Sequence, residues 1–458
     1  MPLRSRSVLV RRAGRLHRLA PLALGIALGL GLSASARAQS LFDLYQAARA
    51  FDAPYLSARA LAESATYRAE EAHGIRRPQI GLGASVARST SDNTSADTTT
   101  KTYGATLNGS QTLFNRANDL AIAQADKGVE AAKTQVLAAE QDLIVRVAQA
   151  YFDVLAAQDA LTTAQANKRA ISEQLASAKR NFEVGTATIT DTREAQARYD
   201  LATAQELKAD NDLRTAHIAL DTLVGRSATP HGLASPLALD SVLSGSVDEW
   251  VAPIEGAPPV LGKRIAYEVA QLDTQKARAG HLPTVDLSGS YGRGHAATDG
   301  TSFVPITSTI DNSGRANSST IGVTLKLPLY AGGQIQNRVK ETLKLEEVAR
   351  QDLEAARRDT AQRTRQAYFG VQSLQSQVKA LEAAESSSQL ALEATQLGYK
   401  VGVRVNLDVL NAQTQLYTTQ AQLAKARYDV LVSSLKLRQA AGTLSAEDVL
   451  KVNQLLAK

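Results

Sequence analysis

The 458-residue chain carries a formal charge of +6, but residues 1–38 contain seven arginines and no acidic residue, so the remainder has a formal charge of −1. This balance gives no support for nucleic-acid binding, which requires a basic surface. The chain has no cysteine, which excludes disulfide bonds and thiolate metal sites.

Residues 1–38 have the pattern of a secretory signal peptide. Arginines precede an apolar run over 19–32, and Ala36-Arg37-Ala38 has the small-x-small form of a cleavage site. We therefore expect a secreted chain that begins at Gln39 after cleavage. The missing cysteine also predicts that no lipid anchor is attached. Beyond residue 38, no apolar run is long enough to predict a transmembrane helix.

The rest of the chain contains one pattern twice. Residues 181–196 align with 398–413 at an offset of 217, which places Gly185 on Gly402 and Asp191 on Asp408. The same offset aligns Tyr151-Phe152 with Tyr368-Phe369, and Gly225 with Gly442. A repeat of this kind is a better guide to organisation than length. We predict a first structural repeat over 39–225, an inter-repeat connection over 226–260, a second repeat over 261–442 and a C-terminal segment over 443–458.

Each repeat contains a predicted β-hairpin, at 79–114 and at 284–330. In both hairpins apolar residues alternate with polar or small ones at period two, as in Ile80, Leu82 and Val86. A strand of about ten residues can cross a bilayer at a tilt. A wet-faced sheet in water is the alternative, but two such hairpins in a secreted chain favour the membrane. The expected strands cover 79–91, 102–114, 284–293 and 320–330, and the expected exterior loops cover 88–101 and 296–318.

Four strands cannot close a barrel, and lipid does not tolerate open sheet edges. The barrel must therefore be completed by further copies of the chain. Two copies supply 8 strands and three supply 12, and only the wider barrel leaves an open lumen, because side chains fill the interior of an 8-stranded one.

Long helices follow the hairpins. The runs 117–182 and 334–399 contain no proline, and each would extend about 100 Å at 1.5 Å per residue. Gly185 and Gly402 suit the ends of these helices, and Asp191 and Asp408 suit the starts of the next. Two apolar seams on the last helix predict neighbours on two sides, whereas a two-helix coiled coil needs one. The seams consist of Leu410, Thr414, Tyr417, Ala421, Ala424, Tyr428, Leu431 and Leu435, and of Leu416, Leu423, Val430 and Leu437.

The mature chain resembles the TolC family of outer-membrane export ducts over its whole length. The residues that carry this resemblance are Gly398–Gly402, Asn406–Ala412, Ala426–Tyr428 and Gly442–Leu450. The resemblance implies a mixed α and β membrane protein, a homotrimer in the outer membrane of a Gram-negative bacterium. Its 12-strand transmembrane β-barrel would continue into a long periplasmic α-helical barrel, with residues 443–458 near the equatorial region. The helical hairpins would taper to a closed tip that opens when a pump complex docks.

The resemblance also implies a gate at this tip. In a trimer Asp408 would form a ring of three carboxylates that divalent cations block. The position one helical turn later is Asn411, where relatives often have a second acid, so we expect weaker block. The alternative is that Asp191 and Asp408 only support helix N-termini. Tyr399 and Arg404 are expected to reach two residues of the first repeat, Asp191 and Thr190.

No pattern indicates catalysis, a cofactor or a structural metal. The six histidines lack metal-ligand spacing, and the glycines of 289–294 lie in a strand pattern and not in a nucleotide-binding turn. We predict a channel-tunnel that docks with an inner-membrane ABC transporter and a periplasmic adaptor to export an unfolded protein, because the ending GTLSAEDVL resembles the type I secretion branch. The alternatives are a multidrug efflux component, a periplasmic coiled-coil adaptor and an outer-membrane spacer without a lumen.

Overall fold

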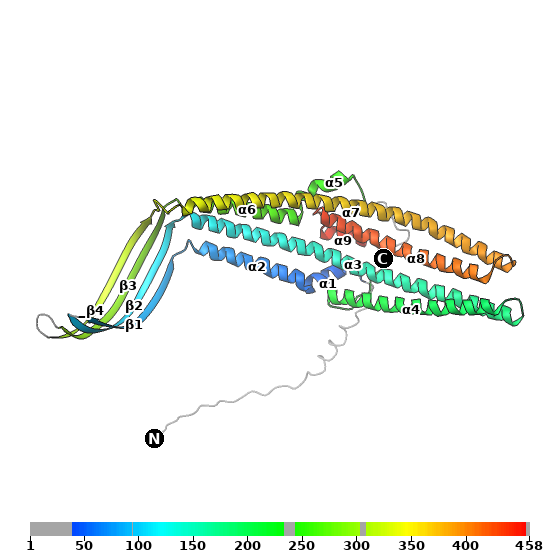
Figure 1. The fold of residues 1–458 in the computed structure, drawn as a ribbon, viewed down its shortest axis with the longest axis horizontal. Helices are drawn as coiled ribbons and strands as arrows, with labels where there is room; N and C mark the ends of the chain where they lie inside the picture. The colour runs from blue at the N-terminus through cyan, green and yellow to red at the C-terminus, as the bar shows by residue number, and fades with distance from the viewer. Residues whose placement is uncertain (1–38, 94, 233–242, 303–307, 455–458) are drawn as a thin grey trace, which may run out of the picture.

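The computed structural model describes residues 39–93, 95–232, 243–302 and 308–454. The signal peptide predicted over 1–38 lies outside these residues. The protein is an elongated rod with a β-sheet at one end and helices extending away from it (Figure 1). None of the described helices combines the length and the hydropathy that a membrane-spanning helix requires.

The sheet has four antiparallel strands in the order β1-β2-β3-β4. The two hairpins pair with each other through β2 and β3, where Leu107 lies opposite Tyr291. Among the described residues, no strand neighbours the outer edge of β1 or of β4. The strands are β1 (Gln79–Asn93), β2 (Ala96–Phe114), β3 (Thr284–Ser302) and β4 (Ser308–Lys326).

The strands are longer than predicted at their outer ends. The segments 88–101 and 296–318, expected as loops, are largely strand, and the ladder pairs Arg88 with Lys101 and Ala296 with Gly314. The prediction failed because it required an apolar face, whereas a strand beyond the hydrocarbon needs only a paired backbone, and Thr favours that conformation. At the other end β4 stops at Lys326, two residues before Pro328, which cannot donate to a ladder.

The two faces of the sheet differ in chemistry. The register places Leu82, Leu107 and Tyr291 on one face, together with Ile321 and Val323. We call this the apolar face. Its side chains are open to the outside in the single chain, with Ile321 83% exposed. The opposite face carries Gly, Ser, Thr and Asn almost throughout. A contiguous apolar band of this size on an extended sheet is typical of a surface that meets lipid.

Two long helices connect the sheet to the far end of the rod. They are α3 and α7, and at 68 and 67 residues each extends about 100 Å. Shorter helices flank them near the sheet, and α4 and α8 fold back from the far end (Figure 1). The helices are α1 (Leu41–Phe51), α2 (Ala53–Gly74), α3 (Arg116–Glu183), α4 (Ile189–Val224), α5 (Val247–Val251), the 3-10 helix η2 (Ala252–Gly256), α6 (Pro258–Ala279), α7 (Gln334–Lys400), α8 (Asn406–Ala440) and α9 (Ala446–Asn453).

The main apolar core lies at mid-length, where α1, α3, α8 and α9 meet. We call it the mid-length core. Tyr151 and Phe152 are fully buried there, and Phe152 stacks on Tyr428 with ring centroids 5.8 Å apart. The equivalent aromatic pair of the second repeat does not form a core, because Phe369 is 55% exposed. The two repeats therefore share their long helices and the aromatic pair, but this pair is packed differently in each.

The two seams predicted on α8 contact different helices. Leu431 and Leu435 of the first seam lie in the mid-length core with residues of α3. Leu423 and Val430 of the second seam pack with Val378 of α7. The prediction of neighbours on two sides is thus confirmed.

Candidate functional site at the hairpin tips

A glycine follows the end of each long helix, two residues beyond its last residue, at the far end of the rod. Gly185 and Gly402 have φ values of +79°, a left-handed conformation that side chains other than glycine adopt at a cost. Neither glycine would bring an added Cβ within 4 Å of another atom. Backbone conformation, and not lack of space, therefore calls for glycine at both predicted tip positions.

The first tip begins its return helix with a complete capping box. The Thr188 hydroxyl accepts from the Asp191 backbone N–H at 3.2 Å, and the Asp191 carboxylate accepts from the Thr188 backbone N–H at 3.0 Å. Reciprocal bonds of this kind satisfy two helix-end donors that otherwise lack partners. Thr190 is exposed on the same turn. The carboxylate of Asp191 thus makes its hydrogen bonds within its own helix end.

The second tip is capped less completely. Its N-cap residue is Val405, which has no side-chain acceptor, and Asp408 accepts from the Val405 backbone N–H at 3.4 Å. The guanidinium of Arg404 lies 3.6 Å from the Asp408 carboxylate, whose side chain is 35% exposed. Arg404 was predicted to reach Asp191, and the structure places it beside Asp408 of its own hairpin instead. The tip acid of the second repeat therefore remains partly open to its surroundings.

Polar side chains join the two hairpins near their tips. Asn181 donates to the Tyr399 hydroxyl at 3.1 Å, so Tyr399 does reach the first repeat, but at Asn181 and not at Asp191 or Thr190. Arg198 donates to Asn411 at 2.8 Å. A third contact joins Gln174 of α3 to Asn406 of α8.

Few apolar side chains support this contact between the hairpins. Leu410 is fully buried among residues of the first hairpin, including Ile171 and Leu175. Beside it Asn406 and Gln413 are also buried, and each has one side-chain polar atom without a hydrogen-bond partner among the described residues. A buried polar atom without a partner costs about 1–3 kcal/mol. The tip interface is consequently weakly held for its size.

The mid-length region is held by ion pairs whose carboxylates are buried. Arg146 of α3 makes two bonds to Asp52 between α1 and α2, at 2.8 and 2.9 Å, and the Asp52 side chain is 5% exposed. The bonds from Arg146 lower the pKa of Asp52, and the same pairing raises the pKa of Arg146. Planar two-point pairing of this kind is among the stronger contacts that side chains make.

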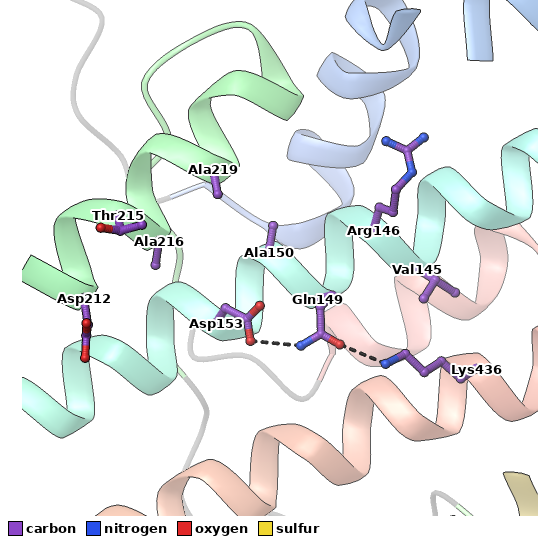
Figure 2. Close-up of a pocket in the computed structure, with 10 residues that line it drawn as sticks. All are labelled: Val145, Arg146, Gln149, Ala150, Asp153, Asp212, Thr215, Ala216, Ala219 and Lys436. Carbon is purple, nitrogen blue, oxygen red and sulfur yellow. Dashed lines mark hydrogen bonds between the residues drawn. The ribbon is translucent and has the colours of Figure 1, made fainter. Parts of the chain in front are cut away.

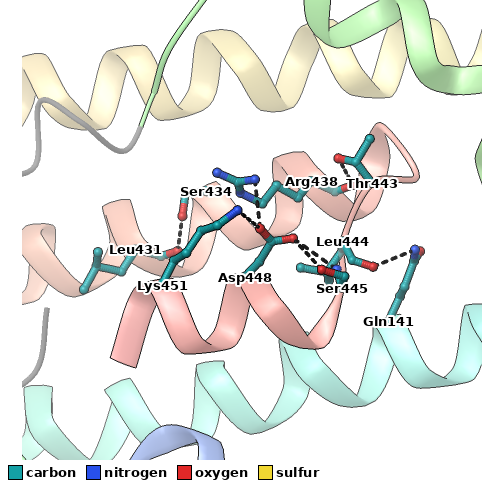
Figure 3. Close-up of polar contacts among 9 residues, drawn as sticks. All are labelled: Gln141, Leu431, Ser434, Arg438, Thr443, Leu444, Ser445, Asp448 and Lys451. Carbon is teal, nitrogen blue, oxygen red and sulfur yellow. Dashed lines mark hydrogen bonds and ion pairs between the residues drawn. The ribbon is translucent and has the colours of Figure 1, made fainter. Parts of the chain in front are cut away.

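The C-terminal helix is anchored in the same region. The carboxylate of Asp448 bonds to Arg438 at 3.0 Å and to Lys451 at 3.1 Å, and it accepts from the Ser445 backbone N–H (Figure 3). Gln141 of α3 donates to the Leu444 carbonyl at 3.1 Å. These contacts place residues 443–454 at mid-length, against α8 and α3.

A groove of about 550 Å³ lies beside the mid-length core, between α3, α4 and α8. Its polar groups are already paired in a chain, because Lys436 donates to Gln149 at 3.0 Å and Gln149 donates to Asp153 at 2.9 Å (Figure 2). In the part of the chain that the structure describes, no three His, Cys, Asp or Glu side chains could hold a metal ion.

Sequence reasoning missed the partners that lie far apart along the chain. Arg146 and Asp52 are separated by 94 residues, and Arg198 and Asn411 by 213. One signal was available for the tip. At the offset of the two repeats Tyr399 aligns with Phe182, so the hydroxyl exists only in the second copy and has to find its partner outside the repeat pattern.

The chain is similar to known outer-membrane proteins. The family model described as outer membrane efflux protein matches residues 33–226 and 254–443. The outer membrane protein TolC of Vibrio cholerae is 35% identical over 96% of this chain and 98% of the relative. The alkaline protease secretion protein AprF of Pseudomonas aeruginosa is 33% identical over 76% of this chain and 71% of the relative.

A solved structure shares the fold. The chain matches that of CusC with a TM-score of 0.75 at 19% identity, over 88% of this chain and 92% of the other. At this identity the likeness concerns the fold alone. It confirms the predicted architecture of two repeats, a β-sheet and long helices.

Proposed function

The chain belongs to the outer membrane efflux protein family, and we propose that it is the channel-tunnel of a type I secretion system. It is an outer-membrane channel protein of a Gram-negative bacterium, with a large periplasmic helical part. In the proposed system it docks with an inner-membrane ABC transporter and a periplasmic adaptor, and an unfolded protein passes through it.

One observation carries the choice of cargo. The alkaline protease secretion protein AprF is 33% identical over 76% of this chain, whereas the efflux protein BepC of Brucella suis is 28% identical over 87% of it. The second candidate is a multidrug efflux component, and the description of the family as efflux proteins favours it.

The sheet supports a trimer. β1 and β4 leave two unpaired edges, and each unpaired backbone group in lipid costs several kcal/mol. Pairing β4 of one copy with β1 of the next removes every edge. Three copies of the four-stranded sheet supply a barrel wide enough to keep a lumen open, whereas two copies would give an interior filled by side chains.

Gene deletion separates the two candidates. We expect deletion to abolish export of at least one secreted protein while the minimum inhibitory concentrations of drugs stay within about twofold of the parent. Complementation with the wild-type chain should restore secretion, and complementation with Val323→Pro should not, because proline removes a ladder donor in the sheet. Drug hypersensitivity with intact secretion would favour the efflux candidate.

We also propose a cation-sensitive gate at Asp408. The support is that the polar contacts of Asp408 with the described residues are to its own helix end and to Arg404, and that it stays partly exposed. Three copies around an axis could therefore present three carboxylates. The residue one turn later is Asn411, an uncharged amide bonded to Arg198, so no second acidic ring follows Asp408. Single-channel recording of Asp408→Asn should show loss of divalent block.

The repeat provides the matched control for this test. Asp191 occupies the same place in the first tip, but its carboxylate belongs to the capping box with Thr188. Asp191→Asn should leave divalent block unchanged. If both substitutions have the same effect, the two acids only cap helices and the gate lies elsewhere.

A further inference from the structure

The outer half of the apolar face carries a group of basic side chains. Six basic residues lie in the four strands, and five of them share this face. Only Lys326, at the end of β4 nearest the helices, lies on the opposite face. We call the five the basic belt, which consists of Arg88, Lys101, Arg293, His295 and Arg315.

The ladder concentrates the belt in three consecutive rows of the same face. Arg293 lies opposite Ala105 in the first row, and His295 lies between Tyr103 and Arg315 in the second. Arg88 lies opposite Lys101 in the third row. The belt therefore follows directly after the apolar band, at the edge marked by aromatic rings, where a bilayer passes from hydrocarbon to head groups.

Two features of the belt call for an anion. Arg88 faces Lys101 across the ladder, and like charges directly opposite destabilise a sheet. In the part of the chain that the structure describes, none of the five forms an ion pair with a carboxylate. The acids of this face, Asp92, Asp97, Asp299 and Asp311, all stand farther out, so the charges are sorted by height.

Three residues of the basic belt line a depression on the sheet. It measures about 440 Å³ and is lined by Arg293, His295 and Arg315 together with Val86 and Tyr103. The Tyr103 and His295 rings are stacked with centroids 6.5 Å apart. An apolar floor with guanidinium groups at its rim suits an amphipathic molecule that bears phosphate, since guanidinium binds phosphate with two parallel bonds.

We propose that the basic belt binds the phosphorylated head groups of lipids in the outer leaflet of the outer membrane. The helices mark the periplasmic end of the rod, so the far end of the sheet reaches the outer leaflet (Figure 1). The phosphates sit between Arg293 and Arg315 and between Arg88 and Lys101, and the acyl chains lie along the apolar face. Each belt thereby fixes the height of the barrel in the membrane.

The test uses the full chain purified in detergent and stripped of lipid. The probes are lipid A with its phosphates, lipid A from which the phosphates have been removed, and inorganic phosphate. Phosphorylated lipid A should bind and raise the melting temperature, and the other two probes should not. Arg293→Gln with Arg315→Gln should weaken binding roughly 30-fold, because each cation at a membrane surface contributes about fivefold.

Lys326→Gln is the matched control, because it removes a strand cation from the opposite face. It should leave binding unchanged, and Arg88→Gln with Lys101→Gln should weaken binding like the first double variant. Equal binding of dephosphorylated lipid A, equal loss in Lys326→Gln, or competition by inorganic phosphate alone would each overturn the assignment. Either double variant that assembles normally and still binds like the wild type would also overturn it.

Discussion

The mid-length core and the tip interface join the same helices by different means. At mid-length, α3 meets its neighbours through buried aromatic and aliphatic side chains and through the pair Arg146–Asp52. At the tip, α3 meets α8 through Leu410 and a few polar side chains, some with unpaired atoms. An apolar contact is lost in proportion to the area exposed, whereas a polar contact exchanged for water costs little. One region fixes the shape of the rod, and the other can separate at small cost.

Arg146→Ala should have the largest effect on stability. It leaves Asp52 buried without its cation; because 34% of the Arg146 side chain is exposed, the loss should fall toward the lower end of the about 3–5 kcal/mol that breaking a buried pair costs. The melting temperature of the detergent-purified protein measures this loss. Arg363→Ala, which breaks an exposed pair with Asp359, is the control and should cost under about 1 kcal/mol.

Matched leucine truncations test the two regions directly. Leu431→Ala in the mid-length core should cost about 3 kcal/mol and lower the melting temperature of the whole protein. Leu410→Ala should act locally, so that limited proteolysis near Gly185 and Gly402 increases while the main melting transition stays in place. Equal effects of the two variants on global melting would break the distinction between core and tip.

The mid-length region should also weaken in acid. The pKa of Asp52 is lowered in the folded state because Arg146 bonds to its ionised form. Its contribution is therefore fully present above the unfolded pKa of about 3.9 and is lost as the pH falls through the folded value. Asp52→Asn should melt at a lower temperature than wild type at pH 7, and the gap should narrow below about pH 4. A gap that widens in acid would contradict the pairing.

Loosening the tip should change conductance and not stability. Tyr399→Phe with Arg198→Ser removes two contacts between the hairpins, to Asn181 and to Asn411. We expect the single-channel conductance to rise severalfold with less than about 1 kcal/mol lost from the fold. Tyr417→Phe is the control, because its hydroxyl has no hydrogen bond among the described residues. A lower melting temperature without a change in conductance would assign these contacts to the core.

The smallest effect concerns the difference between the two tips. Val405→Thr would give α8 the capping residue that α4 has in Thr188, and the exposed position offers space for it. The gain should be about 1 kcal/mol or less. Slower hydrogen exchange in the first turn of α8, with no change in the first turn of α4, is the measurement. Unchanged exchange would show that Arg404 and Asp408 already stabilise this helix end.

The features that the sequence predicted are those with local causes. Gly185 and Gly402 marked both tips because a left-handed residue at a helix end is a local requirement. The prediction of the strand ends was wrong because the stretches of Ser and Thr have no apolar alternation, although their backbones still pair. The prediction of the partner of Tyr399 was wrong for a different reason, because the partner depends on how the two long hairpins are rotated against each other. The spacing of residues within one hairpin does not predict this rotation.

The length of α3 makes the mid-length core a fulcrum. From Phe152 in the core to Glu183 at the tip, the helix extends roughly 45 Å at 1.5 Å per residue. A tilt of about 5° at the core would thus displace the tip by about 4 Å, which is more than a hydrogen bond can stretch. The lever also works in reverse, because a contact at the tip resists tilting with the mechanical advantage of the whole arm. A single hydrogen bond from Asn181 to Tyr399 can therefore hold the two hairpins together at the tip, although much stronger contacts hold the helices at the core.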